Sequence, residues 1–133
     1  MAALIDKGDI TFEYKHFIVV GDGVRSTWAA EASECAADQG KFWAYHDVLL
    51  KSQQDQPWSK DKLKTYGAKI GLDSKTFGQC VDKRTHSNAV KADQADGTKL
   101  QVKGTPTYFV NGKQVPLDFN LILKTINDEV SKK

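Results

Sequence analysis

Residues 104–112, Gly-Thr-Pro-Thr-Tyr-Phe-Val-Asn-Gly, constrain the fold of this chain more than any other stretch. Thr107–Val110 is β-branched and aromatic, which is typical of a buried strand. The dipeptide Asn111-Gly112 tolerates positive φ at both residues, as the type I′ turn of a tight hairpin requires. Pro106 stands at the first residue of the strand, where its missing N–H costs least. The stretch therefore predicts a proline turn followed by a short strand and a hairpin.

Composition limits the class of protein. With 133 residues the chain can bury one substantial core but hardly two. Its 40% hydrophobic and 27% charged residues are ordinary for a globular protein. The net charge of +2 is too small to argue for a nucleic-acid partner. No apolar run is long enough for a membrane-spanning helix, so we expect no membrane association. Met1–Lys7 is too short and too charged for a signal peptide, so either the chain stays inside the cell or a leader precedes it.

Hydrophobic periodicity predicts one strand, a series of helices, the hairpin and a last helix. Ile10–Phe17 alternates apolar with polar residues and is predicted to be a strand. Met1–Lys7 resembles the last turns of a helix, and the second hairpin strand covers Lys113–Val115. Four or five helices are expected between strand and hairpin, the fifth over about Thr85–Gln101. The expected helix-capping residues are Ser26 or Thr27, Ser59, Asp73 or Ser74, and Asp118.

Three segments resemble the DsbA-like thiol-disulfide oxidoreductases of the thioredoxin superfamily. They are Ala29–Asp47, Tyr66–Asp73 with Phe77 and Cys80 downstream, and Val102–Gly112. The resemblance extends over nearly the whole chain in an unchanged order. It implies an α/β, thioredoxin-like fold of the DsbA type with a helical insertion. The whole of 1–133 would form a single domain, with its thioredoxin part at 1–22 and 102–133 and the insertion at about 24–101.

The chain departs from the family at its amino-terminal side. Family members carry about 35–45 further residues before the point that Met1 matches, a length that suits a βα unit. That unit holds a central strand and the redox Cys-x-x-C, whereas this sequence has no Cys-x-x-C. The resemblance thus implies an N-terminally truncated sheet and no catalytic dithiol, so we assign no catalytic residue.

A missing central strand would leave rows of unpaired backbone groups between Ile10–Phe17 and Thr107–Val110. We therefore expect a homodimer or another strand-completing association. The flanking strands could instead collapse into an antiparallel pair, or the missing piece could be supplied separately.

The resemblance assigns substrate binding to Gly104, Thr105 and Pro106. In the family, the peptide bond before this proline is cis, and the preceding residue pairs through its backbone with an extended substrate. The alternative is that Pro106 starts an edge strand with a trans bond.

The resemblance also suggests that Cys35 and Cys80 form a second, non-catalytic disulfide, which fits an oxidising compartment. The alternative is two buried free thiols.

Two cysteines and three scattered histidines lack the spacing of metal ligands, so we expect neither a metal nor a cofactor. His16, at the end of the expected strand, is a slightly better catalytic candidate than His46, and His86 is expected to be solvated.

The first interpretation is a member of a protein-disulfide oxidoreductase and isomerase family. Such proteins act by thiol-disulfide exchange on extended thiol or disulfide segments of secreted or periplasmic proteins, and we expect a periplasmic or other extracytoplasmic location. The chain itself should be redox-inactive, because the dithiol is absent. One alternative is a non-enzymatic peptide-binding or assembly module that uses the proline loop. Another is a glutathione-using transferase or isomerase of related fold.

Overall fold

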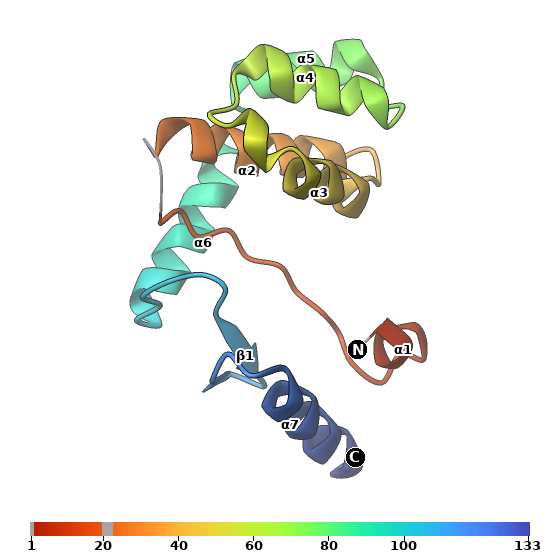
Figure 1. Ribbon diagram of the computed structural model, residues 1–133, viewed down its shortest axis with the longest axis vertical. Coiled ribbons are helices and arrows are strands. Elements are labelled where there is room, and N and C mark those ends of the chain that lie inside the picture. The colour runs from red at the N-terminus through yellow and green to blue at the C-terminus, as the bar shows by residue number, and fades with distance from the viewer. Residues whose placement is uncertain (1, 20–22) are drawn as a thin grey trace. The chain divides into compact units, whose positions relative to one another are not determined.

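The computed structural model describes residues 2–19 and 23–133. Its helices and strands (Figure 1) are, in chain order, α1 (Ala2–Asp6), α2 (Val24–Ala37), α3 (Phe42–Lys51), the 3₁₀ helix η1 (Gln53–Asp55), α4 (Lys60–Lys69), α5 (Ser74–Lys83), α6 (Ser87–Lys99), β1 (Tyr108–Val110), β2 (Lys113–Val115) and α7 (Phe119–Ser131). The chain packs as two compact units. One contains residues up to Lys15 together with Gln101–Lys133, and the other contains His16–Leu100.

The first unit is built on the predicted hairpin. β1 and β2 are antiparallel, and Tyr108 lies opposite Val115. Asn111 and Gly112 have φ of 49° and 81°, which confirms the turn with positive φ at both central residues.

Helix α7 packs against the hairpin and begins after Asp118, whose carboxylate accepts a hydrogen bond from the Leu121 N–H (3.0 Å), as predicted. The buried residues of this unit are Val115, Ile122 and Ile126, and the partly buried Leu4, Ile10, Tyr108, Val110 and Val130 pack against them.

The predicted strand Ile10–Phe17 is wrong. Residues 10–19 form neither helix nor strand, and Figure 1 draws no arrow there. In the described part of the chain the sheet consists of β1 and β2, so this segment neither joins a sheet nor pairs with the hairpin. Side chains of α6 bind its backbone instead. Asp93 accepts from the His16 N–H (3.0 Å), and Gln94 accepts from the Ile18 N–H (2.7 Å).

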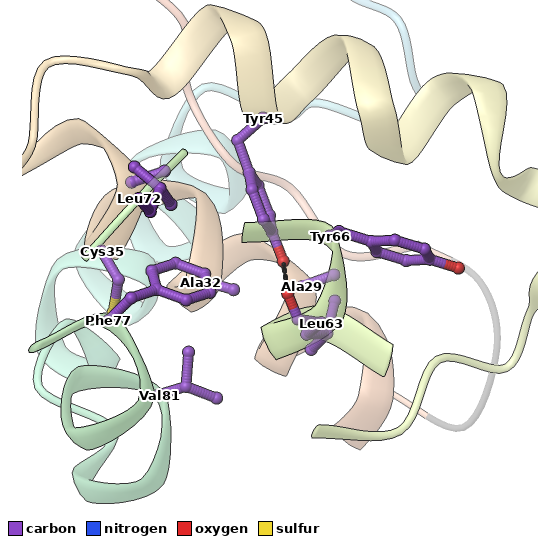
Figure 2. Packing of buried hydrophobic residues seen from close by; sticks show 10 residues of the cluster. Ala29, Ala32, Cys35, Tyr45, Leu63, Tyr66, Leu72, Phe77 and Val81 are labelled. Atoms are coloured by element: carbon purple, nitrogen blue, oxygen red, sulfur yellow. Dashed lines mark hydrogen bonds between the residues drawn. The ribbon is translucent and has the colours of Figure 1, made fainter. Parts of the chain in front are cut away.

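The second unit is an all-helical body arranged around α2, which contacts α3, α4, α5 and α6. Alanines along α2 permit this close packing because they bring little side-chain volume between the helices. Figure 2 shows the resulting core, whose buried members are Ala29, Ala32, Cys35, Ala36, Tyr45, Leu63, Tyr66, Leu72, Phe77 and Val81. Within it the Tyr45 hydroxyl donates to the Leu63 carbonyl (2.9 Å), and burial raises the pKa of that hydroxyl.

Two of the predicted caps in this unit are confirmed. The Ser59 hydroxyl oxygen accepts from the Lys62 N–H (3.1 Å), and the Asp73 carboxylate accepts from the Thr76 N–H (2.8 Å). The latter bond lowers the pKa of Asp73. Both side chains satisfy backbone donors that the first helical turn leaves unpaired.

The cap predicted for α2 is wrong, because the helix begins at Val24 and Gly23 is its N-cap. Thr27 lies inside the helix, where its hydroxyl donates to the Gly23 carbonyl. Helix α6 is also shorter at both ends than predicted. Arg84, the C-cap of α5, has a φ of 51°, and Gln101, just past α6, has a φ of 60°; a helix does not continue through such left-handed backbone.

Candidate functional site

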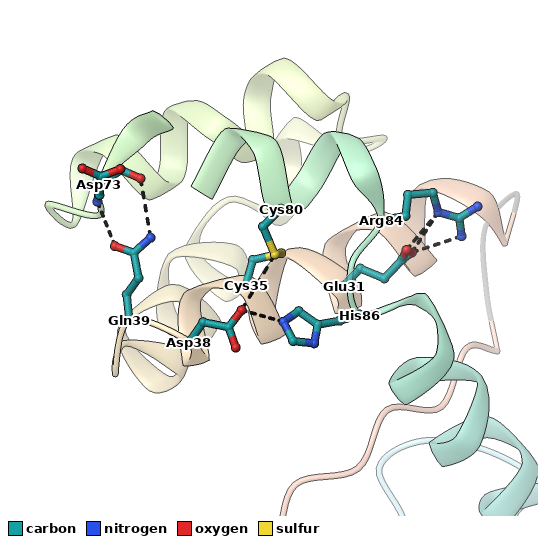
Figure 3. Close-up of a disulfide and its surroundings, with 8 residues drawn as sticks. All are labelled: Glu31, Cys35, Asp38, Gln39, Asp73, Cys80, Arg84 and His86. Carbon is teal, nitrogen blue, oxygen red and sulfur yellow. Dashed lines mark hydrogen bonds and ion pairs between the residues drawn. A yellow bond between two sulfur atoms is a disulfide. The ribbon is translucent and has the colours of Figure 1, made fainter. Parts of the chain in front are cut away.

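Cys35 and Cys80 form a disulfide that joins α2 to α5 (Figure 3). Their Cα atoms are 5.9 Å apart, and 45 positions separate the cysteines in the sequence. Cys35 is 1% exposed, whereas Cys80 is partly exposed. The disulfide prediction is thus confirmed over the alternative of two free thiols. The described residues include no free cysteine.

A histidine and a carboxylate lie beside this disulfide. The Nε2 atom of His86 is 2.7 Å from Oδ2 of Asp38, and the same oxygen is 3.9 Å from Sγ of Cys80. The two sulfurs and a ring nitrogen of His86 all lie within 4.8 Å of one another. The prediction of a solvated His86 is therefore wrong, since its side chain is only 22% exposed and is paired. Linear spacing could not reveal this cluster, because α3, η1 and α4 separate Cys35 and Asp38 from Cys80 and His86 along the chain.

Two further contacts tie α2 and its carboxyl-terminal turn to α5. The carboxylate of Glu31, a residue 2% exposed, accepts from Arg84 Nε (2.9 Å) and Nη2 (3.1 Å), and these bonds raise the pKa of Arg84. At the other end of α5, the Asp73 N–H donates to the Gln39 amide oxygen (2.8 Å). Sequence reasoning missed the ion pair between Glu31 and Arg84. A single charge in the alanine-rich stretch 29–32 was the available signal that a buried carboxylate needed a partner.

The Gly104–Pro106 loop belongs to the other unit. The peptide bond between Thr105 and Pro106 is cis, and both residues are exposed. The Thr107 hydroxyl donates to the Gly104 carbonyl (2.6 Å) and so stabilises the turn that leads into β1. A second cis bond, before Pro57, had no sequence signal that we recognised.

The loop continues directly into β1, which bonds to β2 along one edge. No other described strand pairs with the second edge of β1. An extended peptide can bind such an edge through main-chain hydrogen bonds.

The remaining histidine candidates lie elsewhere in the helical unit and are held by carboxylates. His16 is buried, with Nε2 2.7 Å from Glu34 Oε1. His46 Nδ1 is 3.2 Å from Asp47 Oδ1. The structure therefore shows both rings in ion-pair geometry, and neither belongs to the group formed by the sulfurs and His86.

None of the described helices has both the length and the apolar character needed to cross a bilayer.

Comparison with known proteins relates nearly the whole chain to one family. The family model described as "Thioredoxin" matches residues 1–128. Disulfide bond formation protein D of Bacillus subtilis is 30% identical over 135 residues, an alignment that covers 97% of this chain and 61% of that protein. The Na(+)/H(+) antiporter NhaA 3 of Salinispora tropica is 32% identical over 118 residues, which cover 89% of this chain but 18% of the antiporter. The chain thus spans less than two thirds of either curated relative.

A solved structure gives the same result. Oxidised BdbD from Bacillus subtilis matches with a TM-score of 0.83 and 30% identity, over 96% of this chain and 72% of BdbD. This match includes the helical insertion that the sequence predicted. From the family model and this structural match together, we conclude that the chain belongs to the thioredoxin superfamily and, within it, to the DsbA-like thiol-disulfide oxidoreductases.

Proposed function

We propose that the chain is the substrate-binding scaffold of a protein-disulfide oxidoreductase that acts on thiols of extracytoplasmic proteins. The observation that carries this proposal is the match to oxidised BdbD over 96% of the chain. The family match favours this interpretation over a non-enzymatic module.

Substrate binding is assigned to Gly104, Thr105 and Pro106 and to the adjoining edge of β1. Thr105 and Pro106 are exposed, and β1 presents an edge without a described partner strand. An extended segment of a protein substrate would add to this edge as a strand, bonding through its main chain and so without strong sequence preference.

The scaffold by itself has no dithiol turnover. Thiol-disulfide exchange begins with attack by a thiolate, usually one stabilised at a helix amino terminus. The sequence has two cysteines, and both belong to the disulfide between α2 and α5. The reactive pair would therefore have to be supplied by another segment or another protein.

A disulfide of this kind persists in oxidising compartments, which supports a periplasmic or other extracytoplasmic location.

The same edge of β1 would also accept a strand from a second copy or from a strand-bearing partner. Homodimerisation and substrate binding would then compete. Sedimentation analysis should show dimers that dissociate when an extended polypeptide is added in excess. A monomer at all concentrations would remove the dimer from the proposal and leave the substrate-binding assignment in place.

Amide hydrogen exchange tests the substrate loop directly. The probe is a reduced, carboxymethylated protein, which stays unfolded and carries no thiol. Binding should protect amides within residues 104–110, where every residue except Pro106 has an N–H, but not those of α7. Thr105→Pro, which removes a backbone N–H, should weaken binding, whereas Lys103→Ala, which changes only an exposed side chain, should not. Protection confined to other segments would overturn the assignment.

Turnover is tested by insulin reduction with dithiothreitol. The chain should accelerate precipitation of insulin no more than its Cys35→Ser/Cys80→Ser variant does. Acceleration by the unmodified chain that the double variant lacks would show that the disulfide between α2 and α5 is itself the active pair.

A further inference from the structure

We propose that the reduced chain contains a zinc site, formed by Cys35, Cys80 and His86 with Asp38 as the fourth ligand. This inference does not depend on the proposed function. It rests on an arrangement in the helical unit that the spacing of these residues along the sequence had argued against.

The donor atoms are already gathered. Both sulfurs and a His86 ring nitrogen lie within 4.8 Å of one another. The Asp38 carboxylate extends the group, with Oδ2 at 2.7 Å from His86 Nε2 and 3.9 Å from Cys80 Sγ. In a tetrahedral zinc site with Zn–S of about 2.3 Å and Zn–N or Zn–O of about 2.0 Å, neighbouring donor atoms are roughly 3.3–3.8 Å apart. The sulfur atoms must separate markedly once their bond is broken, and the Cα separation of 5.9 Å leaves room for that through side-chain rotation. His86 Nε2 and Asp38 Oδ2, now 2.7 Å apart, must separate by a smaller amount.

The chemistry of the donors selects the metal. Thiolate, imidazole and carboxylate are all ligands that Zn²⁺ accepts, and two thiolates with one of each of the others would complete a tetrahedral site. Hard cations such as Mg²⁺ or Ca²⁺ prefer oxygen ligands and are disfavoured here. Burial of Cys35 and partial burial of Cys80 and His86 limit competition by water.

The site is positioned by contacts that survive reduction. Glu31 and Arg84 form a bidentate ion pair between α2 and α5, and Gln39 holds the start of α5 through Asp73 (Figure 3). The two cysteines therefore remain on facing helices when the disulfide opens. Preorganisation of this kind reduces the entropic cost of gathering four ligands.

The reaction balances with a thiol reductant. Two equivalents of a small-molecule thiol reduce the disulfide to two cysteine thiols and are themselves oxidised to one disulfide. Zn²⁺ then displaces two protons as the thiols bind as thiolates. In reverse, a small-molecule disulfide takes two electrons from the thiolates, which forms the Cys35–Cys80 bond, releases Zn²⁺ and yields two small-molecule thiolates. Metal binding and the disulfide are thus mutually exclusive states of one site.

Cobalt(II) serves as the spectroscopic probe. The protein is reduced with a phosphine, desalted without oxygen and titrated with Co²⁺. One equivalent should produce a thiolate-to-cobalt charge-transfer band and tetrahedral d–d bands, both of which Zn²⁺ removes. The oxidised protein and the Cys35→Ser/Cys80→Ser variant should give neither. His86→Ala and Asp38→Ala should weaken binding about 10-fold or more, and His46→Ala, a histidine outside the group, should leave it unchanged.

Two measurements distinguish a site built by the fold from metal binding by any pair of reduced cysteines. Zn²⁺ should raise the melting temperature of the reduced protein but not of the oxidised one. Reduced protein in concentrated urea should bind Co²⁺ more weakly than the folded protein does. The proposal is overturned if the reduced protein shows no charge-transfer band with Co²⁺, either folded or in urea. It is also overturned if His86→Ala binds Co²⁺ as tightly as the unmodified chain does, or if the urea-unfolded chain binds Co²⁺ as tightly as the folded chain.

Discussion

The disulfide between α2 and α5 should account for a large part of the stability of the helical unit. It closes a loop across 45 positions, and all residues of that loop belong to this unit. In the chain-entropy model such a cross-link removes about 13 cal/mol/K from the unfolded state, or about 4 kcal/mol at 25 °C. Domains of this size are typically stable by only about 5–15 kcal/mol. Loss of the cross-link should therefore bring the protein close to its unfolding threshold.

The experiment compares three forms by urea unfolding. Oxidised protein, phosphine-reduced protein and the Cys35→Ala/Cys80→Ala variant are unfolded in the presence of a zinc chelator. The fluorescence of Trp28 and Trp58, which pack against the core of the helical unit, reports on the transition. Reduction should lower the unfolding free energy by about 4 kcal/mol, and the alanine variant should lose about 1 kcal/mol more, because Cys35 is buried and its sulfur contributes packing.

The reduced chain also serves as the test of the entropic argument. If the unfolding free energy of the reduced chain is less than about 1 kcal/mol below that of the oxidised chain, the cross-link does not stabilise the protein by lowering the entropy of the unfolded chain. Addition of the phosphine to the alanine variant is the control and should change nothing.

Two further predictions concern packing and charge between the helices. Gly67→Ala should destabilise the protein by about 1–3 kcal/mol, because a Cβ there would lie 2.6 Å from the buried Phe77 ring. In the matched helical variant Gly78→Ala the added Cβ would have no contact closer than 3.8 Å, so this variant should gain up to about 1 kcal/mol from helix propensity. Thermal melts of the two variants that shift in the same direction would contradict this reasoning. Arg84→Met should lower the unfolding free energy by about 1–3 kcal/mol, because it leaves the carboxylate of Glu31 buried without its partner; this value is already discounted because the arginine side chain is 42% exposed. In urea unfolding, a Glu31→Gln/Arg84→Met double variant should recover more than half of that loss. An equal loss in the single and the double variant would refute the account.

Features that depend on a few adjacent residues could be predicted from the sequence. The hairpin turn at Asn111-Gly112 follows from backbone preferences of those two residues, and Ser59, Asp73 and Asp118 cap helices because their side chains reach donors in the next turn. These interactions are complete within about four positions, so no knowledge of the remaining chain was needed.

Strand Ile10–Phe17 shows where such reasoning ends. An alternating pattern states which side chains can share a face, but a strand exists only where another strand accepts its hydrogen bonds. Residues 10–19 have no such partner in the described structure, and the side chains of Asp93 and Gln94 take two of their backbone donors.

The sequence by itself therefore determined the hairpin turn, the starts of α4, α5 and α7 and, through resemblance, the family. Only the tertiary structure decided that Glu31 finds Arg84 and that Asp38 and His86 lie beside the disulfide. The physical reason is distance along the chain. These partners lie 48 to 53 positions apart, and contacts of that range form only after α2 and α5 have packed around a common core.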